Sequence, residues 1–161
     1  MERATPRVAS IPALIAGVSG IGHIGRGGGT VAAAVLAVLW TVIGAHALPA
    51  TTQLAGIAAL FALGTWAAGR VEQGWGWDSG RVVVDEFAGM ALALFALPGG
   101  WQTVAIAFVL FRLFDIAKPL GIARLERLPG GWGVMADDLL AGLYANLIMQ
   151  GLVRTNLWTW I

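Results

Sequence analysis

Acidic residues that stand where apolar segments begin or end are the strongest candidates for chemistry in this sequence. They are Asp85, Glu86, Asp115, Asp137 and Asp138. Carboxylates brought close together repel one another unless some are protonated or a cation lies between them. A hard divalent cation prefers oxygen ligands, and the chain has no cysteine and only two histidines. We therefore expect these five residues to be candidate ligands of Mg²⁺.

Two basic residues flank one of these acids. Arg112, Asp115 and Lys118 are spaced three apart, which places them on one slowly drifting face of a helix. One interpretation is a set of ion pairs that neutralises itself and extends toward the membrane surface. The other assigns the carboxylate to a metal ion and the cations to a phosphate group, whose oxygens need positive partners. Charge in so apolar a segment is in itself a functional-site hypothesis.

A glycine-rich segment, GIGHIGRGGGT at residues 20–30, is a second candidate for phosphate binding. Dense glycine lets backbone amides point into a concavity, and the N-terminus of a following helix adds a positive dipole end. Arg26, Thr30 and His23 are the candidate phosphate contacts in this segment. The alternative interpretation is a flexible connection or a re-entrant segment packed through small residues. His46 lies in an uncharged region and is expected to be structural.

Composition indicates an integral membrane protein. Of the 161 residues, 58% are hydrophobic and 12% charged, and the mean hydropathy is +0.77. Each crossing takes about 20 residues, so we expect an all-α polytopic bundle with four to five membrane-embedded helices in a single domain, residues 1–161. Residues 1–30 would form an N-terminal apolar segment and glycine-rich loop, and residues 31–153 the helical bundle. A net charge of +1 suggests no nucleic-acid partner.

The apolar segments and the charges between them predict a topology. The segments are residues 31–48, 51–69, 82–97, 101–117 and 136–153, and residues 8–24 could span, re-enter or lie on the membrane. The start of the chain resembles a secretory signal, but the later segments argue against cleavage. The positive-inside rule places the N-terminal region and the loops at 70–81 and 118–127 in the cytoplasm, with Arg154 as an exception. All candidate site residues then lie at the cytoplasmic end of the bundle.

Three blocks of the sequence resemble one family. They are VVVDEFAGM at 82–90, FRLFDIAKP at 111–119 and LPGGWGVMADDLLAG at 128–142, and they resemble phosphatidylglycerophosphatase A. The resemblance implies a Mg²⁺-dependent phosphatase of the bacterial inner membrane that converts phosphatidylglycerophosphate to phosphatidylglycerol and phosphate. Two stretches depart from the family pattern. HIGRGGGTV at 23–31 replaces a Pro-x-x-Pro-Gly-Thr-x-Gly-Ser loop, and LGIA at 120–123 replaces Trp-Pro-Ile-Arg, so substrate choice is left open.

The resulting hypothesis assigns roles to particular residues. Asp115 and Asp138 are the first choices for essential metal ligands, followed by Asp137, Asp85 and Glu86. The catalytic candidates are Asp115, Asp138, Asp137 and Lys118, and the phosphate oxygens would be held by Lys118 together with Arg112 or Arg26. The nucleophile is either water or an aspartate. A non-catalytic membrane protein that binds cations or anionic lipid, as a carrier or a degenerate family member, is the alternative. A CDP-alcohol phosphatidyltransferase is disfavoured because its DG-x-x-A-R motif is missing. The expected partner is a phospholipid within the bilayer, and an oligomer is possible but not indicated.

Overall fold

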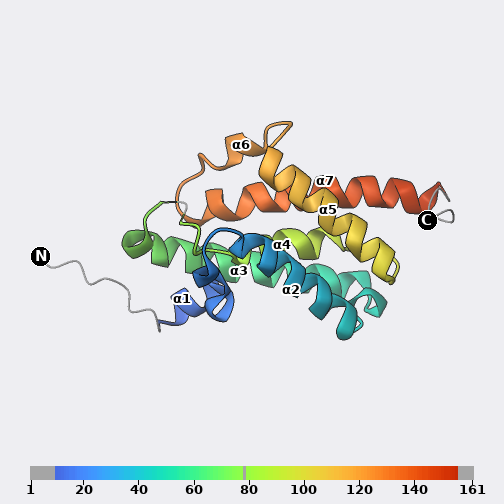
Figure 1. Cartoon of the computed structure of the whole chain (residues 1–161), viewed down its shortest axis with the longest axis horizontal. Coiled ribbons are helices and arrows are strands. Elements are labelled where there is room, and N and C mark those ends of the chain that lie inside the picture. The colour runs from blue at the N-terminus through green and yellow to red at the C-terminus, as the bar shows by residue number, and fades with distance from the viewer. Residues whose placement is uncertain (1–9, 78, 156–161) are drawn as a thin grey trace, which may run out of the picture.

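The structure is a computed structural model that describes residues 10–77 and 79–155, and their regular structure is helical. The elements are α1 (Ile11–Ala16), the 3-10 helix η1 (Val18–Ile24), α2 (Gly28–Val42), η2 (Ala45–Ala47), α3 (Ala50–Trp75), α4 (Val84–Ala93), α5 (Trp101–Ala117), α6 (Ile122–Leu125) and α7 (Gly131–Arg154) (Figure 1). The prediction of an all-helical fold is confirmed for these residues.

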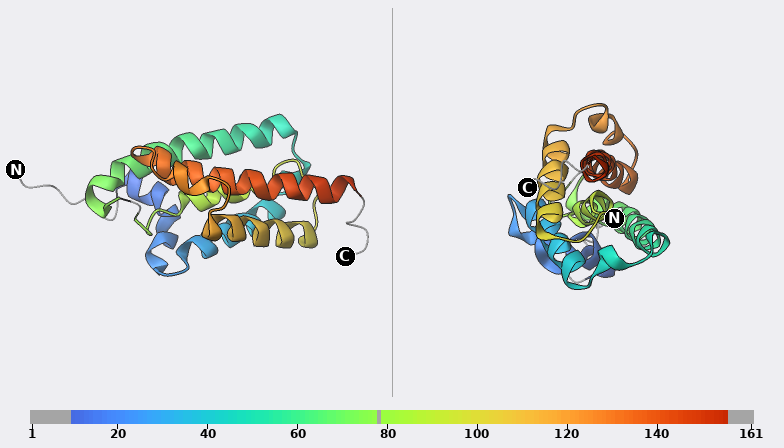
Figure 2. Two further views of the ribbon diagram at one scale, coloured as in Figure 1. Left: turned by 90° about the horizontal axis from the view of Figure 1, so that it is seen from above. Right: turned by 90° about the vertical axis from the view of Figure 1, so that its right-hand side faces the viewer.

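Helix α4 lies at the centre of the bundle. It packs against α2, α3, α5 and α7, which run along the long axis of the molecule around it (Figures 1 and 2). Seven of its ten residues are buried, as expected for a helix that is covered on all sides. Polar groups at its N-terminus are therefore held inside the bundle, where neighbouring helices can reach them.

The third apolar segment forms a shorter helix than predicted. Residues 82–97 were expected to be one membrane helix, but α4 has 10 residues, a length of about 15 Å. The chain then turns, and the amide of Asn146 on α7 donates hydrogen bonds to the carbonyls of Ala93 (3.2 Å) and Phe95 (2.8 Å). A side chain from another helix thus satisfies the backbone groups that the early helix end leaves open.

The N-terminal apolar region folds into two short helices. Residues 8 and 9 lie outside the described part of the chain, and the rest of the predicted segment 8–24 forms α1 and η1, of 6 and 7 residues. Neither is long enough to cross a membrane. The backbone bends at Ser19 and Gly20, which both have positive φ angles, and α1 packs on α3. The helical bundle begins with α2 at Gly28, close to the predicted boundary at residue 31.

Among helices in the described ranges, α3 alone is long and apolar enough to span a membrane by length and composition. Its best 18-residue window has a mean hydropathy of 1.5. Helix α2 is a shorter apolar helix. The expectation of four to five membrane-embedded helices therefore stays a prediction.

Two glycines allow α4 and α7 to approach closely. A Cβ atom on Gly142 would collide with the backbone carbonyl of Gly89, and one on Gly89 would lie 2.6 Å from the Phe111 ring and 2.7 Å from the carbonyl oxygen of Asp138. Only glycine leaves enough room for such backbone contact. The contact brings Asp138 of α7 next to the first turn of α4.

Candidate functional site

Three carboxylates from α4 and α7 converge and form what we call the acidic cluster. Asp85, Glu86 and Asp138 each offer one oxygen, and these oxygens all lie within 4.8 Å of one another. Asp85 Oδ1, Glu86 Oε2 and Asp138 Oδ2 are buried without a hydrogen-bond partner. Within residues 10–77 and 79–155, no ion pair includes any of the three. Unpartnered buried oxygens in such a set fit the ligand preference of a hard divalent cation.

Asp115 lies at the edge of the acidic cluster. Its carboxylate is close enough to Asp138 for the two charges to repel each other, and it forms an ion pair with Arg112 one turn earlier on α5. Of the self-neutralising set in the first interpretation, the structure shows the Arg112–Asp115 pair, whereas Lys118 pairs with Glu126 and Asp137 outside the triplet. Its position beside Asp138 also allows Asp115 to contribute to the acidic cluster.

Asp137 faces a different neighbour from Asp138. Its carboxylate lies 2.6 Å from Lys118 Nζ, and Lys118 also pairs with Glu126. Successive helix residues point about 100° apart, so the two adjacent aspartates cannot both face α4. Burial alone would lower the pKa of Lys118, but the hydrogen bonds and charges of Asp137 and Glu126 outweigh it and raise this pKa above its usual value. Lys118 is thus a fixed cation that joins α5, α6 and α7.

The backbone of Lys118 explains how its side chain reaches α7. Lys118 ends α5 in the left-handed region, with φ 45° and ψ 47°, and Pro119 follows it. Proline has no backbone N–H and disfavours a helical residue before it, so the helix stops here. A left-handed non-glycine residue costs about 1–2 kcal/mol, which is typical of positions whose side chain must be held in one direction.

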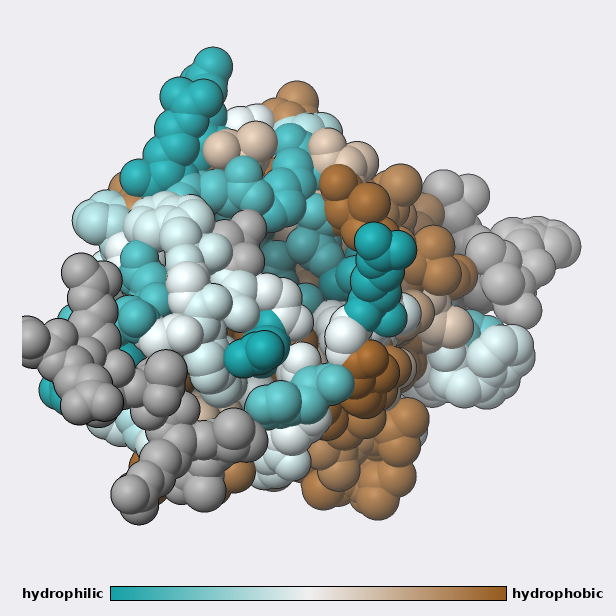
Figure 3. Space-filling view, turned by 60° about the vertical axis from the view of Figure 1, so that its left-hand side comes forward, coloured by the Kyte–Doolittle hydropathy of each residue, from teal (hydrophilic) through white to brown (hydrophobic). Residues whose placement is uncertain are grey.

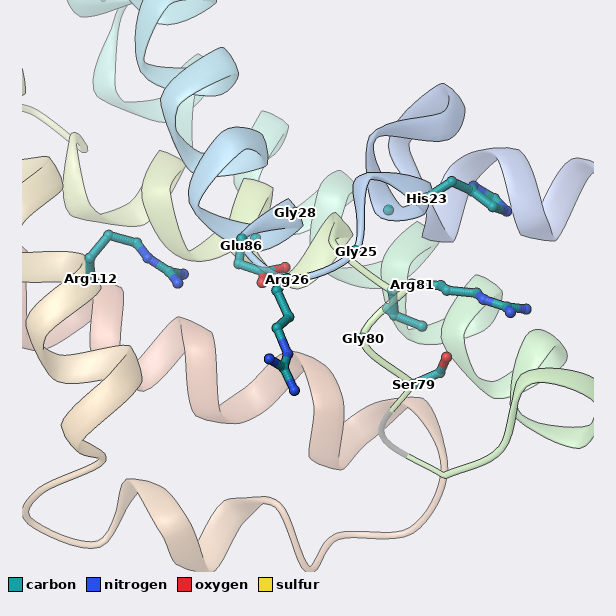
Figure 4. A pocket seen from close by; sticks show the side chains of 13 residues that line it. His23, Gly25, Arg26, Gly28, Ser79, Gly80, Arg81, Glu86 and Arg112 are labelled. Atoms are coloured by element: carbon teal, nitrogen blue, oxygen red, sulfur yellow. The ribbon is translucent and has the colours of Figure 1, made fainter.

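A cavity of about 710 Å³ opens beside the acidic cluster. We call it the cationic cavity: its walls are the glycine-rich loop with His23 and Arg26, residues 79–82, Glu86 and Arg112. Arg112 points toward Glu86, and Arg26 extends from the loop in front of α7 (Figure 4). Hydrophilic residues surround the hollow at this end, with hydrophobic surface beside it (Figure 3). Glu86 belongs to both the cavity and the cluster, so a ligand in the cavity would meet both.

The predicted phosphate contacts from the glycine-rich segment lie in different places. Arg26 and His23 line the cationic cavity, and the His23 ring packs edge-to-face on Trp75 with centroids 5.9 Å apart. Thr30 is exposed on α2 and is not among the residues lining the cavity. A Cβ atom on Gly29 would collide with the Glu86 carboxylate, so glycine at this position lets the first turn of α2 pass directly beside the acidic cluster.

Sequence reasoning missed two charged residues of this region. Arg81 lines the cationic cavity and lies over the Trp75 ring, 6.0 Å from its centroid. Glu126 is a second partner of Lys118. Arg81 stands at the boundary between a charged loop and an acidic helix start, which is a signal that could have found it. Glu126 lies in a loop that was considered only for its basic residues.

Over the described residues the fold is helical, and a cluster of three carboxylates adjoins a cavity lined by arginines. Such a pairing of acidic and cationic groups is found in enzymes that act on phosphate groups. The family model for phosphatidylglycerophosphatase A matches residues 14–153. The chain belongs to the phosphatidylglycerophosphatase A family and is a phosphatase.

Curated relatives agree with this assignment. A Bacteroides thetaiotaomicron protein named "Putative phosphatidylinositol-3-phosphatase" is 41% identical over 151 residues, which are 89% of this chain and 94% of the relative. Phosphatidylglycerophosphatase A of Haemophilus influenzae is 46% identical and that of Escherichia coli 48% identical, each over 74 residues. These two alignments cover 45% of this chain and 45% and 43% of the respective relatives. No solved structure matches the chain.

Proposed function

We propose that this protein removes the terminal phosphate of phosphatidylglycerophosphate in a Mg²⁺-dependent reaction at the cytoplasmic surface of the bacterial inner membrane. The observation that carries the proposal is the acidic cluster, with its three unpartnered buried oxygens, beside a cavity lined by arginines. Family membership supports the reaction class, and two of the relatives are named phosphatidylglycerophosphatase A.

The acidic cluster fits Mg²⁺ by its chemistry. Asp85, Glu86 and Asp138 would hold the ion through carboxylate oxygens, with Asp115 at the edge of the set. A bound Mg²⁺ would neutralise charge that develops on the phosphoryl group and orient the reacting oxygens. Asp137 is better described as the partner that fixes Lys118, because its carboxylate is held by the ion pair.

The cationic cavity would bind and orient the phosphoryl group. Arg112 lines the cavity, so a guanidinium N–H that is not bound to Asp115 can donate to a phosphoryl oxygen while Nη1 stays on Asp115. Arg26 adds a second guanidinium at the cavity wall. Helix α2 begins at Gly28 in the same wall, and the positive end of its dipole favours an anion there.

A multi-pass arrangement would bring this site to the membrane surface. The outward faces of several helices carry exposed large apolar side chains, for example Leu63 of α3, Val109 of α5 and Leu147 of α7, which is unusual for a protein surrounded by water. The N-termini of α2, α4 and α7 and the C-termini of α3 and α5 meet at the end that holds the site (Figure 2). A lipid headgroup could reach this end without leaving the bilayer.

A phosphorylated inositol lipid is the second candidate substrate. The Bacteroides thetaiotaomicron relative is named "Putative phosphatidylinositol-3-phosphatase", and the segment at 23–31, which departs from the family pattern, forms part of the wall of the cationic cavity. Both candidate substrates are lipids with a phosphomonoester on the headgroup. The acidic cluster would serve either one, and the cavity would discriminate between them.

The direct test is release of inorganic phosphate by purified, detergent-solubilised protein. Phosphatidylglycerophosphate and phosphatidylinositol 3-phosphate are compared at equal mole fraction, with Mg²⁺ and with EDTA. We expect Mg²⁺-dependent release from phosphatidylglycerophosphate, loss of release in Asp138→Asn, and retained release in the matched control Glu72→Gln, which lies outside the acidic cluster. Absence of release from both lipids with every divalent ion tested would refute the proposal.

A further inference from the structure

An apolar groove runs along the outside of the bundle between α2 and α5. Its walls come from the stretch Ala34 to Val42 of α2 and the stretch Trp101 to Phe108 of α5, and it encloses about 380 Å³. That volume lies within the range of about 300–1,000 Å³ that is typical of small-molecule sites. The function of the two charged regions does not account for this groove.

Small side chains leave space for the groove, and the hydroxyl group of Thr41 is already hydrogen-bonded. Ala34 and Ala37 of α2 face Ala105 of α5 across it. The hydroxyl of Thr41 donates a hydrogen bond to the carbonyl of Ala37 (2.9 Å), which leaves the methyl group of Thr41 to line the groove. A ligand here would make mainly dispersion contacts.

The groove continues the cationic cavity along the same two helices. Arg112, which lines the cavity, is one helical turn from Phe108, which lines the groove. On α2, Thr30 lies one turn before Ala34 and just after the cavity-lining glycines. Residues one turn apart share a face of a helix, so the cavity and the groove follow each other along the same face of α2 and of α5.

The length of the groove matches a membrane leaflet. At about 1.5 Å per residue, the groove wall from Ala34 to Val42 is about 12 Å long, and α2 spans about 20 Å from Gly29 at the cavity to Val42. One leaflet of the hydrocarbon core is about 15 Å deep. A chain anchored by its headgroup at the cavity therefore has the reach to fill the groove.

We propose that the α2–α5 groove holds one acyl chain of the phospholipid whose phosphorylated headgroup occupies the cationic cavity. The inference rests on the proposed function for the location of the headgroup. A single chain suits a narrow, apolar groove that is open along its length and ends at a cavity for anions. Thr30 then lies where the ester region of the lipid passes from the cavity to the groove.

The absence of cysteine from the sequence permits a direct test with single thiols. Ala105→Cys places a thiol in the groove, and Ala58→Cys places one on an exposed position of α3 away from it. Reaction with N-ethylmaleimide is followed in detergent with Mg²⁺, with and without a non-hydrolysable phosphonate analogue of phosphatidylglycerophosphate. We expect the analogue with sixteen-carbon chains to slow labelling of Ala105→Cys several-fold, and the dihexanoyl analogue or phosphatidylcholine to have little effect.

The remaining outcomes separate this inference from the proposed function. Unchanged labelling of Ala105→Cys by the long-chain analogue, in a variant that still releases phosphate from phosphatidylglycerophosphate, overturns the groove assignment and leaves the function standing. Equal protection of Ala58→Cys or equal protection by phosphatidylcholine also overturns it, because surrounding lipid would then explain the effect. Protection that increases with protein concentration in the absence of lipid indicates a second copy in the groove. If another long-chain phosphomonoester lipid protects the thiol and phosphatidylglycerophosphate is not hydrolysed, the groove stands and the substrate assignment fails.

Discussion

Replacing Asp138 with Asn should have opposite effects on stability and on activity. In metal-free protein, an ionised Asp138 would add its charge to those of Asp85 and Glu86, with oxygens within 4.8 Å of one another. At that distance, two full charges repel by about 3 kcal/mol with an effective dielectric constant of about 20. The amide in Asp138→Asn removes this repulsion from both neighbours while keeping the shape of the side chain, so the variant should be more stable than the wild type in EDTA.

Added Mg²⁺ should reverse that order. A ligand that binds only the folded state stabilises it by about 2.7 kcal/mol at 100 times its dissociation constant. Wild-type protein should therefore unfold at a higher temperature in Mg²⁺ than in EDTA, whereas Asp138→Asn should respond weakly because one carboxylate ligand is missing. Phosphate release should be lost in the variant under both conditions.

Thermal unfolding in one detergent, followed by circular dichroism in EDTA and in increasing Mg²⁺, measures both effects. Glu72→Gln, an acid-to-amide change outside the acidic cluster, should behave like the wild type in each condition. The reasoning is refuted if wild-type stability does not respond to Mg²⁺ and Asp138→Asn is the less stable protein in EDTA. Acidic side chains that need no cation would give that result, for example if they were protonated together.

Three further changes test the elements that hold the site. Lys118→Met leaves a buried aspartate on α7 without its cation, so it should cost about 3 kcal/mol or more, measured by chemical denaturation in detergent. Gly142→Ala forces α4 and α7 apart and should cost about 1–3 kcal/mol and reduce phosphate release, whereas Gly151→Ala, which meets nothing within 4 Å, should be neutral or slightly stabilising in the same assays. Asn146→Leu removes the side-chain donor to the Ala93 carbonyl and one of two side-chain donors to the Phe95 carbonyl, which keeps Gln150. It should lower stability by about 1–2 kcal/mol, with Mg²⁺ stabilisation retained; an unchanged unfolding midpoint would contradict the assigned capping role.

The convergence of the charged helix ends could be predicted from the sequence because it depends only on the order and polarity of the segments. Acidic residues at the N-terminus of one helix and at the C-terminus of an antiparallel neighbour lie at the same end of a bundle, whatever the details of packing. The length of α4 could not be predicted in this way. Residues 94–97 are apolar enough to continue the helix. The chain turns there, and the side-chain amide of Asn146 on α7 binds the backbone carbonyls of Ala93 and Phe95. That contact spans 51–53 residues of sequence.

The different environments of Asp137 and Asp138 illustrate a second limit. Adjacent residues of a helix face different neighbours. The sequence alone could therefore have predicted that Asp137 and Asp138 have different partners. The choice of which aspartate joins α4 depends on the register of the α4–α7 contact, and the glycines at 89 and 142 set that register. The sequence shows that both glycines are present but does not show that they face each other.

The packing of α4 and the chemistry of the site are thus two consequences of one contact. Close approach at Gly89 and Gly142 brings the carbonyl of Asp138 against α4, which forces the carboxylate of Asp138 toward the first turn of α4 and its two acids. The electrostatic cost of gathering these acids acts against the same contact that creates the cluster. A bound cation would remove that cost, so metal binding and α4–α7 packing should be energetically coupled. A variant that loosens the glycine contact is therefore expected to weaken Mg²⁺ stabilisation even though it leaves every carboxylate in place.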